Sequence, residues 1–180
     1  GGNLLRISDL LEAFAQKKSI QSLRLPKGIL ILLHSLAQKP VNYDDAQEKH
    51  NHLFGTYFHH VKPVISGEYV DVAIEDLVRD LRRKGKWIFS HIRRQEKIKI
   101  KDGARTFEWF NGYYDNQSQR VEGKVGNNVR MTLTGQVFAV MSTLATDEEV
   151  KAVINSVEKY LRDPKLGGYR LNTDFKVRHY

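Results

Sequence analysis

One segment of the sequence combines aromatic rings with amide and carboxylate side chains. It runs Phe107-Glu-Trp-Phe-Asn-Gly-Tyr-Tyr-Asp-Asn116 and is followed by Arg120-Val-Glu-Gly123. Aromatic faces stack on sugar rings, and fixed amide and carboxylate groups recognise hydroxyls, so this composition suits a carbohydrate-binding site. The alternative is a buried aromatic corner beneath a loop. Composition alone leaves both interpretations open.

Length and composition predict one folded domain spanning residues 1–180. Of the 180 residues, 41% are hydrophobic and 10% aromatic, which excludes a disordered chain. Cysteine is absent, so disulfides, zinc thiolate sites and thiol catalysis are excluded, in keeping with a cytoplasmic location. The longest apolar run, Ile29-Leu-Ile-Leu-Leu33, is too short to cross a bilayer, and no signal peptide is visible.

The net charge of +8 raises the question of nucleic acid. The basic residues are densest between Arg79 and Arg94, where acidic side chains are interspersed and apolar residues recur at helical spacing. A solvated face of an amphipathic helix explains this pattern better than a surface that follows phosphates, which stays as the alternative. Nucleic acid is therefore not the expected partner.

No metal or cofactor site is expected. His50, His52, His59 and His60 fall on one predicted helix, but no pair has the i,i+4 spacing of helical metal ligands. Nucleophile triads, P-loops and dinucleotide fingerprints are absent from the sequence.

The hydrophobic periodicity predicts an all-α fold. Helices are expected over residues 4–17, from Pro26 to about 36, and over 72–95. Another is expected from Asn42 to about 61, and Pro63 ends it. Residues 65–70 are expected to form a short extended turn, and residues 99–124 a long loop with room for short strands.

Two more helices are predicted near the C-terminus. Residues 131–144 read as a mostly buried helix in which Gly135 permits the close approach of a neighbour. Thr146 and Glu149 have the spacing of a capping box for the next helix. Because so few residues separate these two helices, we expect an antiparallel helical hairpin.

Three ordered segments of the sequence resemble the cellobiose-phosphorylase-like glycoside phosphorylases. They are Phe110-Asn-Gly-Tyr-Tyr-Asp-Asn-Gln-Ser-Gln-Arg-Val-Glu-Gly123, Met131-Thr-Leu-Thr-Gly-Gln-Val-Phe138 and Leu166-Gly-Gly-Tyr-Arg-Leu-Asn-Thr-Asp-Phe175. The likeness extends from about Trp109 to Phe175 and is looser before it. It is strongest to the branch acting on β-linked gluco-oligosaccharides, which includes parts of cyclic β-1,2-glucan synthases.

The resemblance implies a part of an (α/α)6 barrel and reversible, inverting phosphorolysis of β-glucosidic bonds. In such enzymes a carboxylic acid protonates the leaving oxygen and inorganic phosphate attacks as co-substrate, with no metal or organic cofactor. The chain departs from the family at the catalytic positions. It lacks the Trp-Asn-Asp segment of the general acid, and it lacks the family's downstream phosphate-binding stretch. The expectation is therefore an internal fragment with no catalytic residue, inactive alone.

If sugar binds, Trp109 and Tyr114 are the expected stacking surfaces. Asn111, Asp115 and Arg120 are the expected hydroxyl partners, with Gln136 and Asp174 as further candidates. The alternative is that Trp109 and Tyr114 belong to the core and that Asp115-Asn116 is a turn.

Two classes of function stay open for the chain. The first is a fragment of a glycoside phosphorylase that binds a β-linked gluco-oligosaccharide. The second is a non-catalytic helical module that binds sugar or a polyanion. Because part of a barrel exposes apolar surface, a homo-oligomer or the missing remainder of the barrel is the expected partner.

Overall fold

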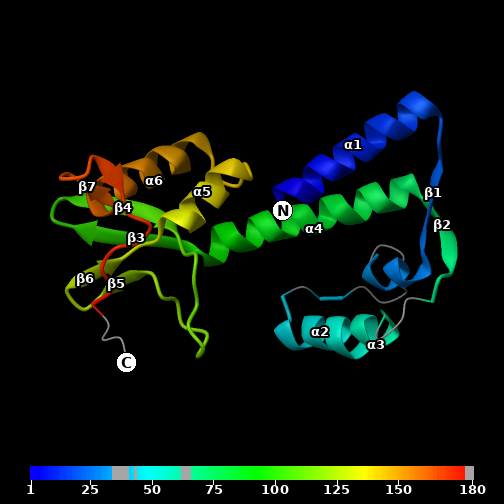
Figure 1. Ribbon diagram of the computed structural model, residues 1–180, viewed down its shortest axis with the longest axis horizontal. Helices are drawn as coiled ribbons and strands as arrows, with labels where there is room; N and C mark the ends of the chain where they lie inside the picture. The colour runs from blue at the N-terminus through cyan, green and yellow to red at the C-terminus, as the bar shows by residue number, and fades with distance from the viewer. Residues whose placement is uncertain (34–40, 43, 62–65, 177–180) are drawn as a thin grey trace. The chain divides into compact units, whose positions relative to one another are not determined.

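The computed structural model describes residues 1–33, 41–42, 44–61 and 66–176 (Figure 1). Helices account for 51% of the described residues and strands for 22%. Among the described residues, the strands form four separate two-stranded antiparallel sheets. The fold is therefore mixed α/β, and the prediction of an all-α fold built from antiparallel helical hairpins was wrong.

By its internal contacts the chain divides into two compact units. Residues Asn3–Lys86 form the N-terminal unit, and Trp87–Tyr180 together with Gly1–Gly2 form the C-terminal unit. The expectation of one domain over residues 1–180 stays a prediction.

The N-terminal unit contains most of α1 (Gly2–Lys18), the β1–β2 sheet and the first half of α4. Strand β1 (Ser22–Pro26) pairs with β2 (Tyr69–Ala73), and β2 leads directly into α4 (Ile74–Gln95). The buried side chains of Leu33, Val72 and Leu77 form its core. The helix expected over 4–17 is confirmed as α1, although Ile7 and Phe14 of its apolar stripe are 46% and 45% exposed. The helix expected over 72–95 is confirmed from Ile74 onwards, and its apolar stripe buries Ile74, Leu77 and Val78.

The helix predicted to begin at Pro26 was wrong. Pro26 ends β1 opposite Tyr69 instead of opening an α-helix, and a 3-10 helix (Lys27–Leu32) follows it. Proline is acceptable at this strand end because it has no ladder hydrogen bond to donate there. The predicted continuation to residue 36 lies outside the described residues.

The segment expected to be one helix from Asn42 to 61 has a different start and an irregular course. Asp45, not Asn42, is the N-cap of α2 (Ala46–His50), and its side chain accepts hydrogen bonds from the backbone of Gln47 and Glu48, both 2.9 Å. A π-helical stretch (Asn51–Tyr57) and α3 (Phe58–Val61) follow. Pro63 lies outside the described residues.

In the C-terminal unit, part of the expected long loop is a β-hairpin. Strands β3 (Lys97–Asp102) and β4 (Arg105–Phe110) pair through a two-residue turn that begins with Gly103 at φ +61°. Glycine supplies the positive φ that such tight hairpin turns require. The isoleucines of Lys97-Ile-Lys-Ile-Lys are buried and its lysines exposed, so the alternation of period two was the signal for this strand.

The remaining elements of this unit surround the hairpin. They are β5 (Gly123–Val125), β6 (Asn128–Arg130), α5 (Leu133–Met141), α6 (Asp147–Tyr160), β7 (Arg162–Asp163) and β8 (Gly168–Tyr169). The core contains Trp109, Met131 and Leu161, which are almost completely buried. The capping box of Thr146 and Glu149 at the start of α6 is confirmed.

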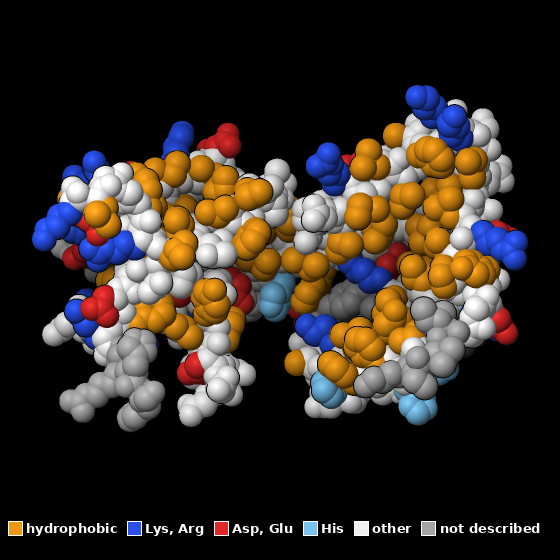
Figure 2. All heavy atoms as spheres, viewed as in Figure 1, with side chains coloured by type: hydrophobic (Ala, Val, Ile, Leu, Met, Phe, Trp, Pro, Cys, Tyr) orange, Lys and Arg blue, Asp and Glu red, His pale blue; other side chains and the backbone are white. Residues whose placement is uncertain are grey.

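Helix α5 is shorter and much more exposed than predicted. Phe138 is 64% exposed and Met141 73%, so the expectation of a mostly buried helix over 131–144 was wrong. Hydrophobic side chains gather on the surface over α5 and α6 (Figure 2). The part predicted correctly is Gly135, whose Cα lies against Gly112, so close that an added Cβ would be 3.1 Å from the Gly112 Cα.

Candidate saccharide site

The loop after β4 is held at both ends by the buried side chain of Glu122. This carboxylate is 5% exposed and accepts four hydrogen bonds. Its donors are Gly112 N (2.7 Å), Thr132 Oγ1 (2.7 Å), Thr132 N (3.0 Å) and Trp109 Nε1 (3.1 Å). Each carboxylate oxygen of Glu122 already accepts two hydrogen bonds, so almost no acceptor position is free for a ligand. Glu122 therefore stabilises the loop.

Gln136 anchors the end of β4 from α5. Its Oε1 accepts a hydrogen bond from Phe110 N (2.9 Å), and its Nε2 donates to Phe110 O (2.7 Å) and Thr132 O (3.1 Å). The side chain is 2% exposed, and Trp109 beside it is 1% exposed. Neither presents an accessible surface to a sugar in this structure.

Three of the predicted site residues come together around Glu96, which follows α4. The hydroxyl of Tyr114 donates to the Glu96 carboxylate at 2.8 and 2.9 Å, and Asn111 Nδ2 donates to it at 3.0 Å. Arg120 Nε lies 4.0 Å from the same carboxylate. Tyr114 and Arg120 are opposite each other in an isolated β-bridge, which brings their side chains together.

The cluster of Glu96, Asn111, Tyr114 and Arg120, hereafter the Glu96 cluster, combines an accessible ring with charged and amide groups. Tyr114 is 49% exposed, whereas Asn111 is only 9% exposed. The Asn111 Oδ1 is buried and has no hydrogen-bond partner among the residues that the structure describes. Such an acceptor costs about 1–3 kcal/mol, which a donor that reached it would recover.

Asp115 and Asp174 lie apart from this cluster in their hydrogen bonding. Asp115 Oδ1 accepts from Gln117 N (2.9 Å) and Gln119 N (2.8 Å), so it stabilises the turn at the tip of the loop. Asp174 is exposed, and its hydrogen bond and ion pair with Lys176 lower the pKa of its carboxyl group.

Sequence reasoning missed both glutamates that organise this region. Glu96 is a single acidic residue between the basic pair Arg93-Arg94 and Lys97. This acid among basic residues at the end of a predicted helix was the only feature of the sequence that pointed to it. Glu122 was counted only among the polar residues that follow the aromatic segment. No local pattern indicates that it would be buried with four donors around it.

The described residues form neither a metal-binding group nor a membrane-spanning helix. Across these parts of the chain, no three His, Asp or Glu side chains are grouped so that they could hold a metal ion. None of the described helices combines the length and apolar character needed to cross a bilayer.

No protein-family model matches the chain. A search of curated proteins likewise found no match.

Proposed function

We propose that the C-terminal unit binds a β-linked gluco-oligosaccharide at the Glu96 cluster, and that the chain is part of a glycoside phosphorylase. The observation that carries the proposal is the convergence of Tyr114, Asn111 and Arg120 on one carboxylate. A half-exposed ring beside an acid, an amide and a guanidinium offers a stacking surface together with hydroxyl donors and acceptors. The sequence resemblance of this same loop to β-glucan phosphorylases supports the choice of sugar.

The binding surface in this proposal differs from the one expected from the sequence. Tyr114 provides the stacking face, and Trp109 supports the loop from the core through its hydrogen bond to Glu122. Glu96 and Arg120 contact sugar hydroxyls, and Asn111, whose oxygen is buried, positions the Glu96 carboxylate through its amide nitrogen. Asp115 and Gln136 form hydrogen bonds with backbone groups of the loop and of β4 and do not contact the sugar. Asp174 lies outside the cluster.

Direct binding tests this proposal. We expect cellotetraose or a β-1,2-linked glucotetraose to bind in isothermal titration calorimetry, and Tyr114→Ala to abolish detectable binding. Tyr113→Ala is the matched control, because Tyr113 is the neighbouring ring and is 51% exposed. No heat with either oligosaccharide, or equal loss in both variants, would contradict the proposal.

The chain alone is proposed to be inactive in phosphorolysis. Positioned general acids contribute about a hundred- to ten-thousand-fold in rate, and the segment that supplies the acid in the resembled enzymes is missing from this sequence. Of the arginines in the segments that carry the resemblance, Arg120 lies beside Glu96 and Arg170 pairs with Asp163. Phosphate-dependent release of glucose 1-phosphate, abolished by Asp115→Asn, would contradict this.

A cytoplasmic location belongs to the same proposal, supported by the absence of cysteine. The second candidate function is a non-catalytic module that binds a polyanion. The observation that favours it is the surplus of basic residues on α4. The two functions are distinguished by binding at high salt, which screens the attraction between the basic residues and a polyanion. Sugar binding that persists at high salt supports the saccharide site.

A further inference from the structure

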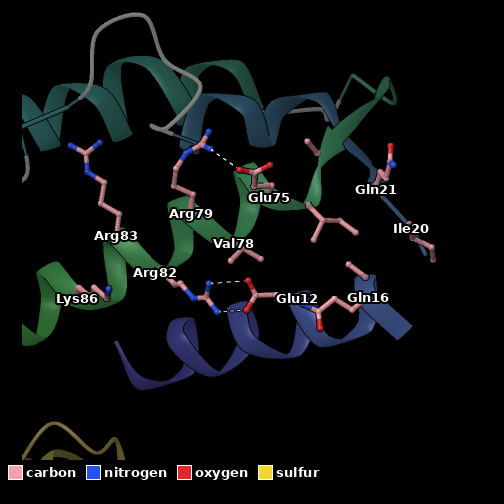
Figure 3. Close-up of a pocket in the computed structure, with 13 residues that line it drawn as sticks. Glu12, Gln16, Ile20, Gln21, Glu75, Val78, Arg79, Arg82, Arg83 and Lys86 are labelled. Carbon is pink, nitrogen blue, oxygen red and sulfur yellow. Dashed lines mark hydrogen bonds and ion pairs between the residues drawn. The ribbon is translucent and has the colours of Figure 1, made fainter. Parts of the chain in front are cut away.

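A groove lies in the N-terminal unit where α1 and the following turn meet the first half of α4 (Figure 3). Its volume is about 1070 Å³, which is enough for a small organic molecule. Its uncharged lining consists of Ala15, Gln16, Ile20, Gln21, Ala73, Ile74 and Val78. The groove therefore offers an apolar surface together with two amide side chains.

Four basic side chains from one stretch of α4 line the same groove: Arg79, Arg82, Arg83 and Lys86. Two of them are already paired with acids. Arg82 lies 2.6 Å from Glu12 on α1 (Figure 3). It also lies 2.8 Å from Asp9 on the same helix. Arg79 pairs with Asp76 and lies 3.9 Å from Glu75.

The other two cations, Arg83 and Lys86, are exposed. Neither makes an ion pair or a side-chain hydrogen bond with any residue in the part of the chain that the structure describes. Three residues apart on a helix, they are neighbours on its surface. Glu12 and Glu75 are the only acids that line the groove, so its described lining carries an excess of two positive charges.

We propose that this groove binds a small organic phosphate monoester. A phosphate monoester carries about −1.5 to −2 charges near neutral pH, which matches the excess on the lining. The guanidinium of Arg83 can hold two phosphate oxygens at once, and Lys86 adds a point charge. The organic group of the ester then extends along the groove towards Val78, the apolar lining residue nearest to these cations on α4.

The acids around the groove favour a small ligand over a nucleic acid. Asp9, Glu12, Glu75 and Asp76 all form ion pairs with Arg79 or Arg82, the other two arginines of the groove. A nucleic acid would extend its phosphates over these carboxylates, with a repulsion that a single phosphate between Arg83 and Lys86 avoids.

Phenyl phosphate is a suitable probe, titrated into the full chain and followed by calorimetry. We expect saturable binding, weakened about tenfold by Arg83→Gln and again by Lys86→Gln, because each substitution removes a charge-assisted hydrogen bond. Lys101→Gln and Arg105→Gln change the net charge equally from exposed positions of the C-terminal unit, and we expect them to leave binding unchanged. Circular dichroism of each variant checks that the fold is kept.

Several results would overturn the proposal. Absence of binding, or equal weakening by the two control variants, would mean that Arg83 and Lys86 form no site. Equal affinity for inorganic phosphate would mean that the apolar lining holds no organic group, and equal affinity for phenol would mean that the cations hold no phosphate. Displacement of phenyl phosphate by duplex DNA at far lower concentration would identify a polyanion surface instead.

Discussion

Glu122 is the residue on which the structure of the loop after β4 depends most. Replacement by alanine leaves the buried donors of Trp109, Gly112 and Thr132 without an acceptor. Each orphaned donor is costly, so we expect Glu122→Ala to lower the free energy of unfolding by about 3 kcal/mol.

The measurement is urea denaturation followed by tryptophan fluorescence, with exposed Glu148→Ala as the control. The control is expected to stay within about 0.5 kcal/mol of the original protein. Equal unfolding midpoints for Glu122→Ala and the control would contradict the structural task assigned to Glu122.

Ionisation of the Tyr160 phenol makes the free energy of unfolding depend on pH in the alkaline range. Burial raises the pKa of its phenol to about 12, and the hydrogen bond to Asp102 Oδ2 (3.1 Å) adds to the shift from 10.0. The folded chain holds this proton more tightly than the unfolded chain. The resulting stabilisation is therefore complete below about pH 10 and is lost as the pH rises towards 12.

Thermal unfolding measured across this alkaline range tests the assignment. We expect the midpoint of the original protein to fall more steeply with pH than that of Tyr160→Phe, which cannot lose a phenolic proton. Tyr113→Phe is the control and is expected to follow the original protein. Parallel curves for the original protein and Tyr160→Phe would show that the phenol does not contribute.

At the scale of elements, α5 contacts the end of β4 through two glycines. A Cβ on Gly135 would lie 3.1 Å from the Gly112 Cα, which is backbone and cannot easily move away. Alanine would gain about 1 kcal/mol of helix propensity, whereas overpacking costs about 1–3 kcal/mol. We therefore expect Gly135→Ala to destabilise the chain by about 1 kcal/mol in denaturant unfolding.

Gly55→Ala is the matched control for this prediction. Nothing lies within 4 Å of the Cβ that it would add, so we expect it to be neutral or slightly stabilising. A gain of stability in Gly135→Ala would show that α5 and the loop can separate without cost.

At the scale of the whole molecule, the exposed apolar side chains of α5 predict self-association. Helix α5 carries no charged residue, and Val137, Phe138, Val140 and Met141 are all more than a third exposed. A contiguous apolar surface of this kind is typical of an interaction site. We expect sedimentation equilibrium to show a dimer or larger assembly.

The paired variant Phe138→Ser/Met141→Ser should shift the chain towards monomer. Leu166→Ser/Leu171→Ser is the control, because these two leucines are also highly exposed but lie outside α5. A monomer at high concentration in the original protein would contradict the prediction, as would equal effects of the two paired variants.

Part of the fold could be predicted from neighbouring residues alone. The apolar stripes of α1 and α4 and the capping box of Thr146 with Glu149 depend on residues three or four positions apart, and each was placed correctly. The β3–β4 hairpin carried an equally local signal, the alternation in Lys97–Asp102, and could have been predicted with it.

Other features were decided only by contacts between distant segments. Pro26 ends a strand because β2 pairs with β1, and α5 is exposed because no element of the described chain covers Phe138 and Met141. For the candidate site, the sequence alone determined the residue types and the loop that carries them. Only the tertiary structure decided that Trp109 is buried with its indole nitrogen bonded to Glu122, and that Tyr114 and Arg120 lie beside Glu96. The physical reason is that burial and hydrogen-bond partners depend on which segments meet in space.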